Sequence, residues 1–90
     1  MNSNYVPIAC DIYDYLEIAA MHREPLRIVL HNGAVFEAQA CNVLVREHIE
    51  YFEVNCAGVQ RQIRLDEIKT IESIASPPHF ARISISPQPE

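Results

Sequence analysis

The sequence predicts an α+β domain in which an N-terminal helix is followed by a small, strongly bent, five-stranded antiparallel barrel. Three observations lead to this prediction. A helical pattern is confined to about residues 11–22, the segments after it alternate apolar and polar residues, and Asn32-Gly33 is typical of a two-residue hairpin turn. Short strands that bend into a barrel leave few exposed sheet edges.

The helix at about residues 11–22 has an apolar face and an acidic face. The packed face consists of Ile12, Leu16 and Ala19, with Tyr15 and Ala20 on its flanks. The opposite face consists of Asp14, Glu17 and Met21. We expect Asp11 to be the N-cap, because its carboxylate can accept a hydrogen bond from the free N–H groups of the first turn.

The outward surface of this helix combines charge with large apolar groups. Tyr13 is expected beside Asp14 and Glu17, and Ile18 on their other flank. A solvated face is the ordinary explanation for charged helix residues. The mixture of carboxylates and apolar groups instead indicates a surface that contacts a partner.

The rest of the chain alternates between strand and turn patterns. Pro25 ends the helix, because a proline disfavours helical geometry at the residue before it, so Arg23-Glu24 is expected to lead into the sheet. Five strands are expected at residues 26–31, 34–45, 49–56, 60–65 and 68–74. The second is long and changes its pattern near Cys41-Asn42, which indicates a bend or bulge. The expected turns are Asn32-Gly33, Arg46-Glu47-His48, Ala57-Gly58 and Asp66-Glu67.

A single domain is expected over residues 1–76, since 90 residues can build one sheet or small barrel around one core. Residues 77–90 are expected to form a proline-rich C-terminal tail. Within this tail, residues 79–85 could add a short edge strand.

Composition and charge narrow the classes of function. Hydrophobic residues make up 49% of the chain and its net charge is −5, which predicts a globular domain that repels phosphate. A basic protein partner is therefore favoured, and direct binding of nucleic acid is not expected. No stretch approaches the roughly 20 apolar residues of a membrane span, and the start of the chain lacks a signal-peptide pattern. A cytoplasmic location without membrane contact is expected.

The chain carries no recognisable catalytic or metal-binding pattern. Cys10, Cys41 and Cys56 are far apart, which predicts reduced thiols that serve as small buried hydrophobic residues. The four histidines lack the i, i+4 spacing of a helical metal site, and the two glycines are better used in turns than in a phosphate loop. We expect no enzymatic activity, no metal and no other cofactor.

A series of motifs runs through the chain in a fixed order. They are Tyr5, Pro7-Ile8, Cys10-Asp11, Tyr13-Asp14, Leu16-Glu17, Asn32-Gly33, Glu50-Tyr51, Gly58, Ile63-Arg64-Leu65-Asp66 and Ile68. Together, over about residues 4–75, they resemble the Rho-binding antiterminator (Rof, YaeO) family. The resemblance implies a bacterial monomer with an Sm-like fold. It also implies that the protein binds the transcription termination factor Rho and keeps RNA off Rho's primary RNA-binding sites.

The resemblance also implies which residues contact Rho. They are Asp11, Tyr13, Asp14 and Glu17 of the helix and, as a second contact, Arg46, Glu47 and His48 of a turn. That turn is less basic than its counterpart in the family, so a contact there would be weaker or differently paired. Because an RNA-binding site is basic, Asp14 and Glu17 could lie where phosphates otherwise bind. The chain would then compete with RNA and inhibit Rho-dependent termination.

Two other functions remain open from the residues alone. An Sm-like RNA-binding module is compatible with a small barrel, although the net charge opposes it. An adaptor for a protein other than Rho fits the same composition.

Overall fold

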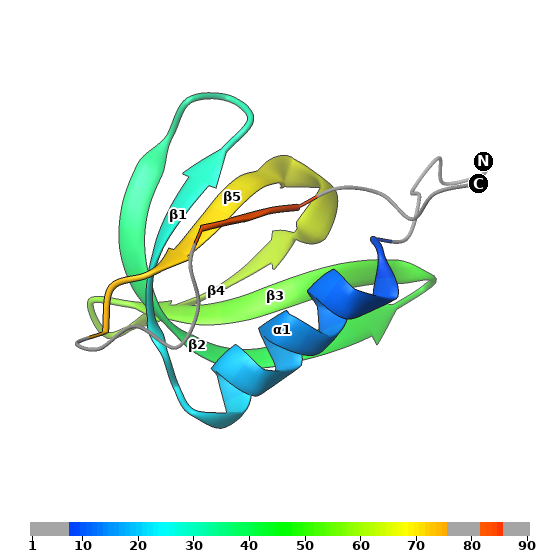
Figure 1. The fold of residues 1–90 in the computed structure, drawn as a ribbon, viewed down its shortest axis with the longest axis horizontal. Helices are drawn as coiled ribbons and strands as arrows, with labels where there is room; N and C mark the ends of the chain where they lie inside the picture. The colour runs from blue at the N-terminus through cyan, green and yellow to red at the C-terminus, as the bar shows by residue number, and fades with distance from the viewer. Residues whose placement is uncertain (1–7, 76–81, 86–90) are drawn as a thin grey trace.

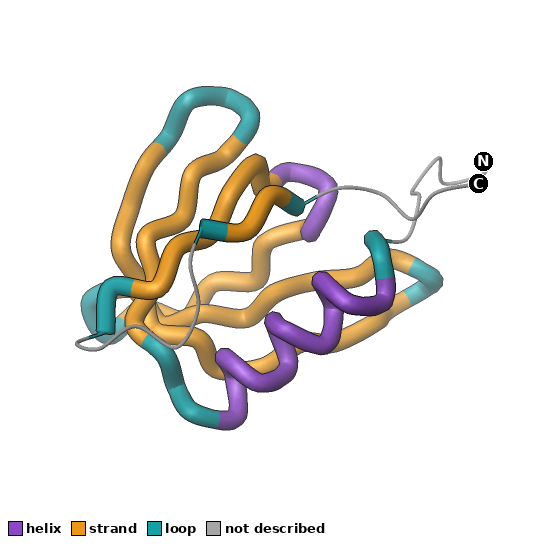
Figure 2. The backbone as a smooth tube through the Cα atoms, viewed as in Figure 1, coloured by secondary structure: helices purple, strands orange, loops and turns teal. Residues whose placement is uncertain are grey.

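The computed structural model of this protein describes residues 8–75 and 82–85. Within them, helix α1 (Cys10–Met21) precedes six strands and the short 3-10 helix η1 (Leu65–Glu67), as Figures 1 and 2 show. The strands are β1 (Pro25–Leu30), β2 (Val35–Arg46), β3 (Ile49–Cys56), β4 (Val59–Arg64), β5 (Ile68–Ser73) and β6 (Ile83–Ser84). They form one antiparallel sheet in the order β4-β3-β2-β1-β5-β6.

This architecture confirms the α+β class but not the closed five-stranded barrel. The described part of the sheet has six strands and is open, with β4 at one edge and β6 at the other. The sixth strand pairs with β5 through Thr70↔Ser84 and Ile71↔Ile83, inside the segment where the sequence permits a short edge strand. Residues 77–81 and 86–90 of the predicted tail lie outside the described residues, so a domain boundary at residue 76 stays a prediction.

The predicted bend in β2 is confirmed. Residues 35–39 of β2 pair with β1 and residues 39–46 pair with β3, and the register shifts between Ala40 and Asn42. One extra residue on the bulged strand bends it, so a single strand can serve both halves of a curved sheet. The bounds of the five predicted strands each agree with the structure to within one residue.

The predicted two-residue turn at Asn32-Gly33 is wrong. Leu30 N donates to Ala34 O at 2.9 Å and Gly33 N donates to Leu30 O at 3.0 Å, which closes a three-residue loop. Gly33 has φ 94° and supplies the left-handed position that such a loop requires. The two-residue hairpins are instead Glu47-His48 and Ala57-Gly58, where every residue has a positive φ.

Helix α1 packs along β2 through a narrow apolar face. Leu16 is fully buried and Ala19 nearly so, while Ile12, Tyr13 and Ala20 are partly buried against the same core. The predicted Asp11 N-cap is wrong: Tyr13 N donates to Ala9 O at 3.0 Å, the helix begins at Cys10, and Ala9 is its N-cap. Asp11 lies inside the first turn and its Oδ1 accepts from Ile12 N at 3.0 Å. Its charge still favours the helix there, because the macrodipole is positive at this end.

The corner between α1 and β1 contains a buried carboxylate that the sequence analysis missed. Glu24 is 1% exposed, and the Ser73 hydroxyl donates a hydrogen bond to its carboxylate. The backbone of Glu24 also donates to Ala19 O and accepts from Ala40 N, each at 2.9 Å. This one residue therefore connects the end of α1 to β2 and β5.

Truncating the central residue of the packed face should destabilise the fold. Leu16→Ala should lower the free energy of unfolding by on the order of 2 to 5 kcal/mol, because a fully buried side chain is replaced by a cavity. Ile18→Ala on the exposed side of the same helix is the matched control, with a change below about 1 kcal/mol. Urea unfolding followed by circular dichroism measures both. Equal losses for the two variants would mean that Leu16 does not anchor the helix.

Candidate protein-binding surface

The outward face of α1 combines carboxylates with exposed apolar side chains. Asp11, Asp14 and Glu17 are all exposed. Beside them, Tyr15 is 47% exposed, Ile18 48% and Met21 76%. We refer to these six residues as the acidic helix surface. A single large apolar residue on a protein surface is ordinary, but three on one helix beside three carboxylates form a surface typical of protein contacts.

The burial of Tyr13 and Tyr15 is the reverse of the sequence prediction. Tyr13 was expected to be exposed beside the carboxylates, but it is half-buried and packs against the core. It precedes Leu16 by three residues, so both lie on the side of the helix that faces the sheet. Tyr15, expected at the edge of the packed face, is one of the exposed apolar residues instead.

Tyr13 lies in an acidic environment at the junction of α1 and β3. The pKa of its hydroxyl is raised, mainly by burial and further by the negative charges of Glu50 and Glu17. Glu50 Oε1 also accepts a hydrogen bond from Ile8 N at 3.2 Å. The Tyr13 phenol therefore stays protonated at neutral pH and can act as a hydrogen-bond donor beside two carboxylates.

The predicted second contact, Arg46-Glu47-His48, lies at the end of the β2–β3 hairpin. The start of α1 and this hairpin end occupy the same end of the molecule (Figure 1). Glu47 (φ 53°) and His48 (φ 68°) form the two-residue turn and are exposed. Arg46 donates to Gln62 Oε1 at 2.7 Å and its guanidinium lies 4.7 Å from the centroid of the Tyr51 ring. These contacts direct Arg46 toward β3 and β4, so the turn presents Glu47 and His48 more freely than Arg46.

A groove separates α1 from the bulged part of β2. Its volume is about 280 Å³, and it is lined by Glu17, Ala20, Met21, Cys41, Asn42 and Val43. The register shift of β2 places Cys41 at the bulge beside the helix. The bulge and the acidic residue Glu17 are both predictable from the sequence, but their proximity depends on how the helix packs.

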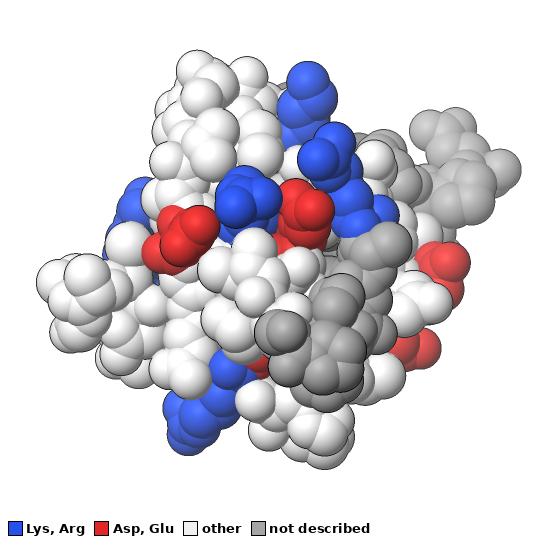
Figure 3. Space-filling model, turned by 60° about the vertical axis from the view of Figure 1, so that its left-hand side comes forward, with Lys and Arg blue, Asp and Glu red and all other residues white. Residues whose placement is uncertain are grey.

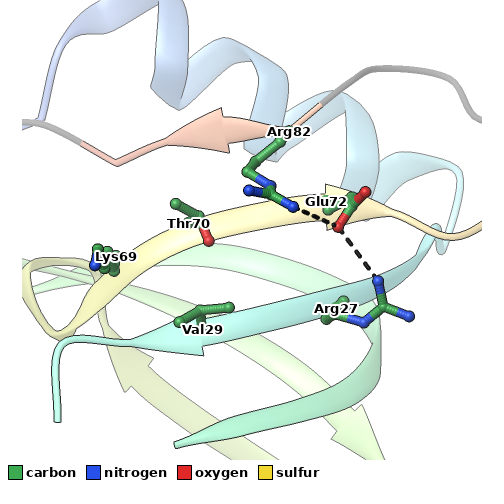
Figure 4. A pocket seen from close by; sticks show the side chains of 6 residues that line it. All are labelled: Arg27, Val29, Lys69, Thr70, Glu72 and Arg82. Atoms are coloured by element: carbon green, nitrogen blue, oxygen red, sulfur yellow. Dashed lines mark hydrogen bonds and ion pairs between the residues drawn. The ribbon is translucent and has the colours of Figure 1, made fainter. Parts of the chain in front are cut away.

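The outer face of β1, β5 and β6 carries a different surface with paired charges. Basic and acidic side chains are interleaved on the face that Figure 3 shows. Arg27 lies 3.3 Å from Glu72 and 3.5 Å from Glu37, and Arg82 lies 3.7 Å from the same Glu72 oxygen. Figure 4 shows Glu72 between the two arginines, beside a pocket of about 240 Å³ that Lys69 also lines.

The closing motif Ile63-Arg64-Leu65-Asp66 forms a structural corner. Ile63 and Leu65 are buried, whereas Arg64 Nε and Nη2 donate to the two Asp66 carboxylate oxygens at 3.1 and 2.8 Å. This bidentate hydrogen bond raises the pKa of Arg64. The motif therefore holds β4 to η1.

The three cysteines are free thiols, and the expectation that they are buried is wrong, because Cys10 is exposed and the other two are only partly buried. Cys41 and Cys56 are half-buried. Among residues 8–75 and 82–85, no group of three His, Cys, Asp or Glu side chains is arranged to hold a metal ion. In the same part of the chain, no helix has the length and apolar character needed to cross a membrane.

The structure is a small α+β domain whose helix exposes a mixture of carboxylates and large apolar side chains, a composition typical of protein-contact surfaces. Residues 7–85 match the family model described as "Modulator of Rho-dependent transcription termination (ROF)". The chain therefore belongs to the Rof family, whose members modulate Rho-dependent transcription termination.

Individual relatives agree with this assignment. The protein rof of Escherichia coli (strain K12) is 43% identical over 68 residues, which cover 76% of this chain and 81% of that protein. The protein rof of Shigella flexneri matches to the same extent. A solved structure described as YaeO bound to magnesium from Vibrio cholerae O395 has the same fold, with a TM-score of 0.72 and 21% identity. That match covers 82% of this chain and 97% of the other.

The environment of Tyr13 predicts a loss of stability at alkaline pH. Below the ordinary pKa of 10.0, the phenol is protonated in both the folded and the unfolded state. As the pH rises above this value, the unfolded chain releases its proton first, so the free energy of unfolding falls until the raised pKa of the folded state is passed. Tyr13→Phe should therefore lose less stability than wild type between about pH 9 and about pH 11 in urea unfolding. Identical losses would show that the folded state does not resist ionisation of Tyr13.

Proposed function

We propose that this chain inhibits Rho-dependent termination by binding Rho through the acidic helix surface and covering Rho's primary RNA-binding sites. The observation that supports this most directly is the exposure of Asp11, Asp14 and Glu17 on the outward side of a helix whose other side is buried. Membership of a family that modulates Rho-dependent termination supports Rho as the partner. The net charge of −5 suits a basic partner site.

The carboxylates supply electrostatic attraction to a site that normally binds phosphate. Charge-assisted hydrogen bonds from Arg or Lys to a carboxylate resemble those to a phosphate in geometry and strength. Tyr15, Ile18 and Met21 add apolar area that a nucleic-acid backbone lacks, so the protein can gain affinity from desolvation as well as charge. The two ligands then exclude each other because they need the same cations.

The remaining predicted residues have supporting roles in this proposal. Tyr13 lies behind Glu17 and donates its hydroxyl at the edge of the contact, while Glu47 and His48 make a second contact at the same end of the molecule. We expect the chain to act as a monomer, as the family resemblance implies, and the pairing of β6 with β5 at Thr70 and Ile71 supports this by covering part of one sheet edge.

An RNA-binding module is the second candidate, and the pocket beside Arg27, Lys69 and Arg82 is the observation that favours it. Glu72 and Glu37 lie within ion-pair distance of the two arginines, so most of the positive charge there is already balanced. An incoming phosphate would have to compete with these carboxylates. The acidic helix surface has the stronger case for this reason.

Reversing charge on the acidic helix surface should abolish binding without unfolding the protein. The double variant Asp14→Lys, Glu17→Lys places two cations against a basic site and should weaken binding to Rho by on the order of several kcal/mol. Both residues are exposed, so the circular dichroism spectrum and thermal midpoint should stay close to wild type. Isothermal titration calorimetry with purified Rho measures the affinity.

The matched control for this experiment compares single reversals. Glu17→Lys and Glu67→Lys change the net charge equally, but Glu67 lies in η1, outside the acidic helix surface. Glu17→Lys should lose affinity and Glu67→Lys should lose much less. If the folded double variant binds Rho like wild type, the acidic helix surface is only a solvated face.

Competition with RNA gives an independent prediction. Increasing amounts of the wild-type chain should displace a labelled single-stranded RNA from Rho in a fluorescence anisotropy titration, since both ligands require the same cations. The double variant should displace no RNA. The chain alone should leave the anisotropy of the RNA unchanged. Simultaneous binding of the chain and RNA to Rho's primary sites would contradict the proposal, and direct binding of the RNA would favour the second candidate.

A further inference from the structure

The groove between α1 and β2 combines a charged wall with an apolar floor. Glu17 and Met21 come from the helix, Asn42 and Val43 come from the strand, and Ala20 lies between them. Ala20 is small, so the helix leaves space beside the bulged residues of β2 that line the same groove. The volume of about 280 Å³ lies below the roughly 300 to 1,000 Å³ of small-molecule sites. A groove of this size is large enough for one long side chain.

The charge of the groove selects the kind of side chain. Among the described residues that line the groove, Glu17 is the only charged one, so within this part of the chain the groove has a negative wall and no basic side chain beside it. The pocket beside Glu72 differs, because two arginines lie within ion-pair distance of that carboxylate. Exposed Asn42 adds an amide group that can accept or donate a hydrogen bond. A cation with an apolar stem is complementary to all of these features.

We propose that this groove receives one arginine or lysine side chain of the protein partner, which rests on the proposed binding to Rho. The aliphatic stem lies on Ala20, Met21 and Val43, and the cationic head reaches the carboxylate of Glu17. Glu17 then has a different role from Asp14, because it anchors one specific basic residue while Asp14 contributes to the general negative potential. The groove thereby fixes the position of the acidic helix surface on the partner.

Two asparagines offer a closely matched test of this proposal. Asn42 Oδ1 accepts from Val43 N at 2.9 Å, and Asn32 Oδ1 accepts from Ala34 N at 2.9 Å. Both residues are exposed. An aspartate keeps either local hydrogen bond and adds one negative charge, so Asn42→Asp and Asn32→Asp have the same net charge. Only the first change adds its charge beside the groove.

The experiment measures the affinity of purified Rho for the two variants and for wild type by isothermal titration calorimetry. Asn42→Asp should bind Rho roughly two- to fivefold more tightly than Asn32→Asp, the range expected for one added exposed ion pair. Asn42→Lys, which places a cation beside the groove, should bind more weakly than Asn32→Lys. Thermal unfolding of all four variants verifies that each is folded.

The outcomes separate this inference from the proposed function. If wild type binds Rho and the two aspartate variants have equal affinity, the groove does not receive a cation and the inference is wrong, while the proposed function stands. If wild type does not bind Rho, both are wrong. Tighter binding by Asn42→Asp together with weaker binding by Asn42→Lys supports the groove as the site of a basic side chain.

Discussion

The apolar contact between α1 and β2, centred on Leu16, determines which side chains the helix can present. With Leu16 and Ala19 buried, the 3.6-residue repeat places Asp11, Asp14 and Glu17 on the solvent side. The Glu24 corner holds the end of the helix to β2 and β5, so the helix has little freedom to rotate. An acidic surface held rigidly in this way loses less entropy on binding than a mobile one.

The bulge in β2 links the fold to the candidate site. It lets one strand pair with β1 and then with β3, and it also places Asn42 and Val43 beside the helix. Without the bulge, the groove beside the helix would lack its irregular wall at residues 41–43. The same feature therefore serves the curvature of the sheet and the shape of the surface.

The sequence predicted most strands and the bulge because strand alternation and turn residues depend mainly on neighbouring residues in the chain. Alternation located five strands to within one residue, and the change of pattern near Cys41 indicated the bulge. Burial of Glu24 depends on contacts with Ser73 and Ala40, which are distant in the sequence, so no local pattern indicated it. The edge strand β6 was indicated only as a possibility, because its pairing with β5 is a contact between distant segments. The exposed carboxylates of the candidate site were predictable from helical periodicity, whereas the groove beside them was not.

The central claim is that Rho covers the carboxylates of α1, and carbodiimide footprinting read by mass spectrometry tests it most directly. Addition of Rho should reduce labelling of Asp14 and Glu17 and leave labelling of Glu67 unchanged, since all three are exposed in the free chain. Excess single-stranded RNA should restore the labelling. Unchanged labelling of Asp14 and Glu17 in a chain that is demonstrably bound to Rho would contradict this account.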